Sequence, residues 1–366
     1  MKISDFTNGK ENNFNAIRMV AAFVVLIAHS FALTGDNTKF AEFFGAASGV
    51  AVDVFFITSG FLVTRSLIAR QNLSDFFWAR FLRIYPALWL MLLLTVFVLG
   101  VFFTSLPVHS YLLSSMTYNY LYKCGILFSG IPFNLPGVFE LNPYKNAVNG
   151  SLWSMPYEVK CYVILGVLWA SLRLFGRDTA QLFKVAIVTT SVGLMLYVIV
   201  CHLNFPNESP RERWFFMFFY GATFYCLKEY IKLSKFIFYP SLIALVLSIV
   251  ATNEQLFVFY VITVAYILFY LAYVPSGFYR KYNQMGDYSY GTYIYAFPVQ
   301  QSVAALIPGI SAWSMIVISA FVTVLLAALS WHFLEHRALG LKGFYATRTR
   351  FSHPWLRKFT SETPPP

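Results

Sequence analysis

The stretch AIRMVAAFVVLIAHSF, residues 16–31, decides the fold class, because it is apolar enough to enter a membrane. It also carries two ionisable side chains, Arg18 and His29, which are 11 positions apart. That separation is three helical turns plus roughly 20°, so both side chains lie on one helix face, about 16 Å apart. Ionisable groups are costly in hydrocarbon and usually face a cavity, a partner or a substrate. The stretch therefore predicts a membrane helix with a functional polar face.

The overall composition is that of a membrane protein. Of the 366 residues, 58% are hydrophobic and only 12% are charged, whereas soluble domains contain about 25% charged residues. The net charge of +11 is explained by basic cytoplasmic loops, so nucleic acid is not an expected partner. The first apolar run is as long as a full span and lacks a clear cleavage site, so we expect it to be retained.

The four cysteines do not indicate a metal site, because none belongs to a C-x-x-C pair. Cys161 and Cys226 lie in apolar runs and are expected to be packing residues. Whether Cys124 and Cys201 form a disulfide is left open.

Ten apolar segments predict an all-α bundle of about ten transmembrane helices. Residues 106–150 interrupt them with a proline-containing loop and one short interfacial helix, on the side opposite the termini. The expected spans are residues 14–33, 44–68, 86–103, 151–175, 183–203, 214–230, 236–251, 256–274, 288–307 and 311–334.

Basic residues are distributed asymmetrically in this arrangement. If the N-terminus is cytoplasmic, 21 of the 27 Lys and Arg residues fall in inner segments and 5 in outer ones. This asymmetry predicts that both termini are cytoplasmic. We expect a transmembrane domain over residues 1–345, a flexible cytoplasmic tail over residues 346–366, and no added esterase-like domain.

Two carboxylates are expected at the depth of His29. Asp53 lies on the second span and Glu158 on the fourth, and both spans run inward. Asp53 is a candidate to orient the His29 imidazole for base catalysis. The alternatives are that His29 is a packing histidine and that Asp53 pairs with Lys160 or another structural partner.

A second polar layer is expected at the cytoplasmic mouth. Arg80 and Arg83 precede the third span and share a helix face. With Arg18 they form a candidate anion site suited to phosphate groups. The alternatives are a snorkelling anchor for Arg18 and ordinary topology charges for the other two. SWHFLEHR, residues 330–337, is interpreted as a polar helix end at the same level.

Six motifs follow one another along the chain. They are Arg18 with His29, VDVFFITSGF (residues 52–61), RFLRIYP (80–86), SLWSMPYE (151–158), GDYSYGTYIYAFPV (286–299) and WHFLE (331–335). In this order they resemble the membrane-bound acyltransferase family 3 over nearly the whole chain. Two positions depart from the family pattern: Ala79 stands where a second arginine is frequent, and Ala296 where a histidine is frequent.

The resemblance implies a multi-pass enzyme of the bacterial inner membrane that moves an acyl group, usually acetyl, from cytoplasmic acyl-CoA to a sugar hydroxyl. The expected acceptor is a cell-surface polysaccharide, lipopolysaccharide or another glycan, free or lipid-linked. Membrane lipid surrounds the protein, and no metal or permanently bound cofactor is expected. The three arginines would hold CoA phosphates, His29 would deprotonate the hydroxyl, and Asp53 or Glu158 would tune it.

Secondary transport is an alternative function of another class. Intramembrane Arg, His, Asp and Glu residues are typical of proton relays in secondary transporters. The sequence shows no inverted repeat and no paired broken helices, which disfavours a transporter.

Overall fold

A computed structural model describes residues 1–7, 9, 11–128, 130–174, 178–205, 211–250 and 254–342. Helices make up 80% of the structure, and the described residues form no β-strand, so the predicted all-α class is confirmed. The expected tail, residues 346–366, lies outside the described residues.

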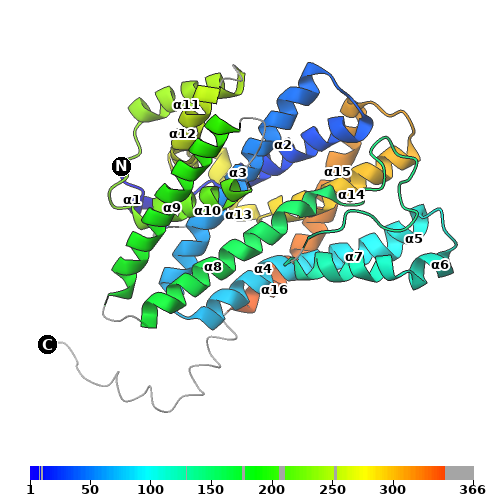
Figure 1. Ribbon diagram of the computed structural model, residues 1–366, viewed down its shortest axis with the longest axis horizontal. Helices are drawn as coiled ribbons and strands as arrows, with labels where there is room; N and C mark the ends of the chain where they lie inside the picture. The colour runs from blue at the N-terminus through cyan, green and yellow to red at the C-terminus, as the bar shows by residue number, and fades with distance from the viewer. Residues whose placement is uncertain are drawn as a thin grey trace, which may run out of the picture.

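The helices follow the order of the expected spans (Figure 1). They are α1 (Ser4–Thr7), α2 (Phe14–Thr34), α3 (Lys39–Arg70), α4 (Leu73–Leu94), the π-helical turn η1 (Thr95–Leu99), α5 (Gly100–Phe103), α6 (Val108–Leu113), α7 (Ser115–Ile126), the 3₁₀ turn η2 (Gly150–Ser154), α8 (Met155–Leu174), α9 (Thr179–Asn204), α10 (Glu212–Cys226), α11 (Lys235–Val250), α12 (Glu254–Tyr273), α13 (Phe278–Met285), α14 (Ser289–Leu306), α15 (Ala312–Ser330), the π-helical turn η3 (Trp331–Glu335) and α16 (His336–Gly340).

Five helical segments among the described residues are long and apolar enough to cross a membrane: Phe14–Thr34, Lys39–Arg70, Leu73–Phe103, Thr179–Asn204 and Ala312–Gly340. A sixth span results if α12 and α13, which meet at an angle of 86°, count as one. The chain is therefore a multi-pass membrane protein, and the count of ten crossings stays a prediction.

The remaining long helices are shorter or more polar for a physical reason. α10 has 15 residues, which at about 1.5 Å per residue is less than the thickness of the hydrocarbon core. α14 contains Gln300 and Gln301, both fully buried. A helix that is enclosed by other helices contacts protein rather than lipid, so it needs neither full length nor an apolar surface.

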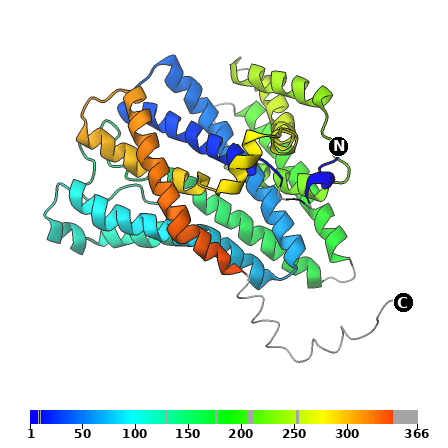
Figure 2. The ribbon, with the colours of Figure 1, turned by 180° about the vertical axis from the view of Figure 1, so that it is seen from behind.

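The centre of the bundle is built around α3 and α14. α3 packs against α2 and α10, and α14 packs against α2 and α15. In Figure 2, α15 and α16 run in orange along the near face. Gly60 of α3 and Gly221 of α10 let the two backbones touch, because a Cβ at either position would overlap a carbonyl oxygen of the other helix.

Two expectations about element boundaries are corrected. The third long helix begins at Leu73 instead of residue 86, because the Asn72 side chain caps it by accepting from the backbone N–H groups of Ser74 and Asp75. Pro86 is therefore inside α4. The segment after residue 106 holds two helices, α6 and α7, where one was expected.

The bundle has two distinct ends. The arginine end holds the start of α2, the start of α4, the start of α14 and the end of α15. The loop end holds the opposite termini of these helices and an irregular loop formed by residues 127–128 and 130–149. The site lies between these two ends.

Candidate active site

Four parts of the chain meet through charged side chains at the arginine end. Arg18 of α2 donates from Nη1 to Asp287 Oδ2 at 2.9 Å, and Arg83 of α4 donates from Nη2 to the same oxygen. The other terminal nitrogen of Arg83 lies 3.6 Å from Glu335 Oε2 at the end of η3. Two cations and two anions thus join four parts of the chain.

Asp287 is positioned to form ion pairs with both Arg18 and Arg83. It lies between Gly286 and the first residue of α14, and its Oδ1 accepts from the Ser289 backbone N–H at 3.2 Å. Burial alone would raise the pKa of the Asp287 carboxyl, but the guanidinium groups of Arg18 and Arg83 outweigh burial and lower the pKa to about 2. The carboxylate is therefore charged throughout the physiological range.

Arg80 was expected to join this group, but in the structure it lies apart from it. Its guanidinium lies 5.9 Å from the centroid of the Tyr162 ring, and its Nε has no hydrogen-bond partner although it is buried. No ion pair involves Arg80 in the part of the chain that the structure describes. The expected three-arginine site therefore divides into an ion-paired group and one cation without a carboxylate.

A small cavity lies next to Arg18. It measures about 30 Å³ and is lined by Arg18, Val52, Phe55, Phe56, Ser154, Met155, Glu158, Tyr290 and Tyr293. This volume holds one or two water molecules. Ser154 and Tyr293 are hydrogen-bonded to each other at 2.7 Å in its wall.

His29 lies beside a second and larger cavity, at the loop end. The cavity measures about 510 Å³ and is lined by His29, Ala32, Leu33, Phe133, Asn134, Tyr144, Lys145, Asn146, Ala147, Gly150, Trp153 and Phe297. The His29 ring meets the edge of the Phe297 ring at a centroid distance of 5.1 Å. His29 Nδ1 is buried and has no hydrogen-bond partner. The imidazole is thus placed by packing, and its Nδ1 is not bonded to any residue that the structure describes.

The expected contact between Asp53 and His29 is absent. Asp53 Oδ2 accepts from Arg213 Nε at 3.1 Å, and it also accepts hydrogen bonds from Arg213 Nη2 and from the Tyr260 hydroxyl. Of the alternatives, a structural ion pair fits the geometry. Its partner is Arg213 instead of Lys160, whose Nζ lies 5.5 Å from the centroid of the Tyr157 ring.

Glu158 is also not bonded to His29. Its Oε1 accepts from Ser59 Oγ at 2.9 Å and from the Tyr162 hydroxyl. Because Glu158 lines the small cavity with Arg18, it belongs to the middle of the bundle, between the arginine end and the larger cavity. Sequence reasoning assigned His29 as the neighbour of Asp53 and Glu158. In the structure, Asp53 contacts Arg213 and Glu158 contacts Ser59 and Tyr162.

A comparison with known families decides the class of protein. A family model described as an acyltransferase domain matches residues 11–332. The chain belongs to this acyltransferase family. The match includes both Arg18 and His29 and reaches the first residues of η3.

Known relatives of this acyltransferase include two proteins named as O-acetyl transferases. An O-acetyl transferase of Shigella phage Sf6 is 29% identical over 90% of this chain and 96% of the relative. Nodulation protein 10 of Rhizobium leguminosarum is 24% identical over 93% and 96%. A putative peptidoglycan O-acetyltransferase of Bacillus subtilis is 26% identical over 88% of this chain and 56% of the relative. No solved structure matches the chain.

Three residues of the polar networks were missed by sequence reasoning. Asp287 lies in a quoted motif but was given no role, Glu335 was interpreted only as part of a polar helix end, and Arg213 was one of the five basic residues counted in outer segments. The Arg83 partners are 204 and more positions away in sequence, so no local spacing signals them. Arg213 stands beside Trp214 at the start of an apolar run, which is a weak sign that it enters the bundle.

The cysteines of the acyltransferase have no catalytic geometry. All four are free thiols, so Cys124 and Cys201 are not paired. Cys124 Sγ donates to the Pro132 carbonyl at 3.7 Å. Cys161 and Cys226 are buried, in agreement with packing roles.

Proposed function

We propose that this acyltransferase moves an acetyl group from acetyl-CoA, bound at the arginine end, to a sugar hydroxyl in the cavity beside His29. One observation carries the proposal: α2 lines two cavities, the small one through Arg18 and the larger one through His29. The turn η2 borders both, with Ser154 on the small cavity and Trp153 on the larger one. One helix and one turn thus connect an anion-binding end to a base.

The donor end fits a ligand with several phosphates. Guanidinium groups bind phosphate oxygens through paired N–H groups, and Arg80 is a half-buried cation without a carboxylate partner among the described residues. Arg18 and Arg83 are held in place by Asp287, so their side chains are already ordered before a phosphate arrives. Ordered side chains lose less entropy on binding.

The larger cavity fits a sugar. Trp153, Tyr144 and Phe133 supply ring surfaces for the apolar face of a pyranose. Asn134 and Asn146 supply side-chain amides, which both donate to and accept from hydroxyl groups. Apolar walls with a few placed polar groups are typical of small-ligand sites.

His29 supplies the base for the transfer. A neutral imidazole nitrogen accepts the proton of the sugar hydroxyl while the hydroxyl oxygen attacks the thioester carbonyl carbon. The new C–O bond forms, the C–S bond breaks, and the proton passes to the departing thiolate of CoA. No Ser or Cys side chain within the described ranges hydrogen-bonds to His29, which favours direct transfer over an acyl-enzyme.

The path between the two ends must widen for the donor. A cavity of about 30 Å³ is too small for the thioester arm of CoA. The Ser154–Tyr293 hydrogen bond lies in its wall, so this pair has to separate when the arm enters. We propose that donor binding separates Ser154 from Tyr293 and widens this part of the path.

The proposed reaction also determines where the enzyme and its two substrates lie relative to the membrane. The enzyme lies in the bacterial inner membrane with both termini in the cytoplasm, so acyl-CoA reaches the arginine end from inside. The acceptor, a cell-surface polysaccharide, lipopolysaccharide or another glycan, enters from the outer side. Membership of the acyltransferase family disfavours the transporter alternative.

Mass spectrometry of surface glycans tests the proposed function. Glycans from cells with the gene should carry one acetyl mass more per modified unit than glycans from cells without it. The His29→Ala variant should restore none of this shift at equal protein level, and wild type should restore all of it. Identical glycan masses in the three strains would refute the proposal.

A further inference from the structure

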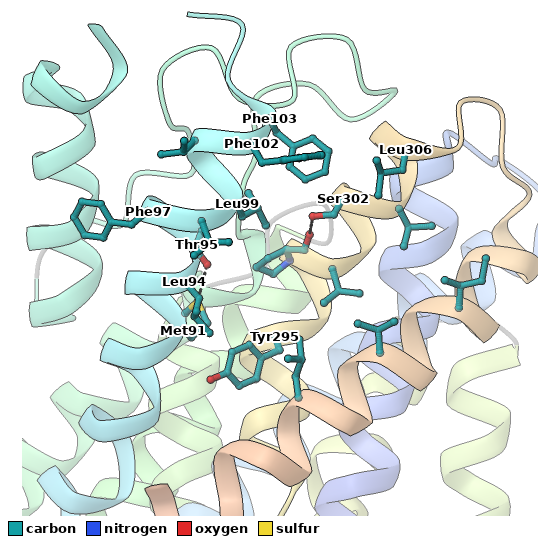
Figure 3. A pocket seen from close by; sticks show the side chains of 18 of the residues that line it. Met91, Leu94, Thr95, Phe97, Leu99, Phe102, Phe103, Tyr295, Ser302 and Leu306 are labelled. Atoms are coloured by element: carbon teal, nitrogen blue, oxygen red, sulfur yellow. Dashed lines mark hydrogen bonds between the residues drawn. The ribbon is translucent and has the colours of Figure 1, made fainter. Parts of the chain in front are cut away.

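A large apolar groove lies beside the acceptor cavity at the loop end. It measures about 990 Å³, with α4, η1 and α5 on one wall and α14 with α15 on the other (Figure 3). Its few polar side chains are satisfied within the protein: Thr95 Oγ1 contacts Met91 Sδ at 3.3 Å, and Ser302 Oγ donates to the Pro298 carbonyl at 2.8 Å. The lining therefore offers a ligand almost nothing but hydrocarbon contacts.

The groove is open to its surroundings. Phe102, Val98 and Leu306 line it and are 71%, 62% and 61% exposed. Thr95 and Val98 belong to η1, a π-helical turn, and such turns are frequent at functional sites. In a membrane an apolar groove of this kind is filled by a hydrocarbon chain.

The loop that lines the acceptor cavity also closes the groove. Residues 133–147, called the cavity loop here, contribute Phe133, Tyr144 and Lys145 to the cavity. Thr104, which follows α5 on the first wall, donates from Oγ1 to the Pro136 carbonyl at 2.9 Å. Gln301 of α14, on the second wall, donates from Nε2 to the Ala147 carbonyl at 2.6 Å. The cavity loop therefore bridges both walls at the end of the groove.

Helix α14 separates the groove from the cavity by a single helix thickness. Phe297 lines the cavity and touches His29, while the next residue, Pro298, lines the groove. A chain lying in the groove would thus carry its head group to the rim of the cavity.

The charge at that rim suits a phosphate. Lys145 is exposed on the cavity loop, and it is the one charged residue besides the titratable His29 among the described residues that line the cavity. Glycosyl phosphates place an anion between the lipid and the sugar, and Lys145 lines the same cavity as His29.

We propose that the groove binds the hydrocarbon chain of a lipid-linked glycan, which is the acceptor, with its phosphate at Lys145 and its sugar at His29. This inference rests on the proposed function. It makes the membrane-anchored glycan, before release from its lipid, the substrate of acetylation.

The proposal is tested by comparing acetylation of one glycan pool in its lipid-linked form and in its lipid-free form. Membranes from cells that lack the gene supply the lipid-linked pool, and mild acid, which cleaves glycosyl phosphates, converts half of it to lipid-free glycan. Purified enzyme with labelled acetyl-CoA should acetylate the lipid-linked pool about tenfold faster than the lipid-free one, the effect of burying a few methylene groups. Equal rates would overturn the proposal, and transfer to neither pool would overturn the proposed function itself.

Variants that fill the groove provide the second part of the test. Ser302→Phe and Val98→Trp introduce bulk from opposite walls, and each should reduce the ratio of the two rates toward one. Val20→Phe is the matched control, because Val20 is exposed and lines a separate apolar groove of about 590 Å³ on α2 and α3; it should keep the wild-type ratio. If both groove variants keep that ratio, or slow both pools equally, the groove holds a structural membrane lipid and the proposal is wrong.

Discussion

Arg18 and Arg83 approach each other although both are positive, because Asp287 lies between them. The exposed fractions of these side chains are 17%, 14% and 11%, so water screens the charges little. Removing one partner of a buried ion group leaves an uncompensated charge, which is strongly destabilising. Asp287 is therefore the residue through which the arginine end can be tested.

The Asp287→Asn variant should lower thermal stability, and CoA should restore more stability to it than to wild type, because the CoA phosphates replace the lost anion. Thermal unfolding in detergent, with and without CoA, measures both effects. Glu42→Gln removes an exposed carboxylate of α3 and serves as the control. An equal response to CoA in wild type and Asp287→Asn would show that these arginines do not meet the donor.

This variant should also respond differently to pH. The Asp287 carboxyl, with its pKa lowered to about 2, stabilises wild type above about pH 4, and this contribution is lost as the pH falls toward 2. The stability difference between wild type and Asp287→Asn should be constant from pH 5 to about pH 8 and should narrow below about pH 4. A constant difference down to about pH 2 would contradict this role of the ion pairs.

At the scale of single residues, spacing predicted part of the site. The 11-residue interval predicted that Arg18 and His29 lie on one face of a helix, and in the structure each of them lines a cavity beside that helix. The partners of Asp53 and Arg83 were not predictable, because they depend on which helices touch, and the positions are 160 and 204 residues apart. A carboxylate in a membrane helix indicates that a partner exists without indicating which one.

Among the helices, contact between α3 and α10 depends on glycine. Gly60 and Gly221 face each other's backbone, and small residues are what permits membrane helices to approach so closely. Gly49, Ser59 and Gly60 are small residues of α3, and small residues of membrane helices are typically packing positions. The structure confirms this for Gly60, whereas a Cβ added at Gly49 would meet no atom within 4 Å and Ser59 hydrogen-bonds to Glu158.

Gly49 and Gly60 of α3 make a matched pair of variants. Gly60→Ala should destabilise the protein by about 1–3 kcal/mol or more, because the opposing atom is a backbone carbonyl that cannot move aside. Gly49→Ala should be neutral or stabilise by up to about 1 kcal/mol, because alanine favours the helix. Thermal unfolding of both variants in detergent measures the difference, and equal effects would contradict the described packing of α3 on α10.

For the whole molecule, hydropathy predicted the order of the helices well and their ends less well. Every expected span overlaps a helix of the structure, because apolar runs of this length have no other fold in a membrane. The start of α4 was missed because Asn72 and the charged turn after it resemble a loop in sequence. Local capping, which hydropathy does not register, decided that boundary.

The orientation of the molecule remains a prediction and can be tested by labelling. A single cysteine introduced at Lys342, next to α16, should react in intact cells only with a membrane-permeable reagent, because the excess of basic residues places this end in the cytoplasm. A cysteine at Lys145 of the cavity loop should react with an impermeant reagent. Both would be made in a background without the native cysteines. Impermeant labelling at position 342 would contradict the predicted orientation.

The central claim is that Arg18 and His29 serve two ends of one path, and purified variants assayed for both acetyl-CoA affinity and acetyl transfer test it most directly. Arg18→Ala should weaken acetyl-CoA binding by about tenfold or more, and Arg18→Lys by less, since lysine keeps the charge but loses the planar fork. His29→Ala should bind acetyl-CoA nearly as wild type does while transfer falls by about 10²–10⁴-fold, the usual contribution of a general base. Transfer by His29→Ala close to the wild-type rate, or the same defect in both variants, would contradict the account.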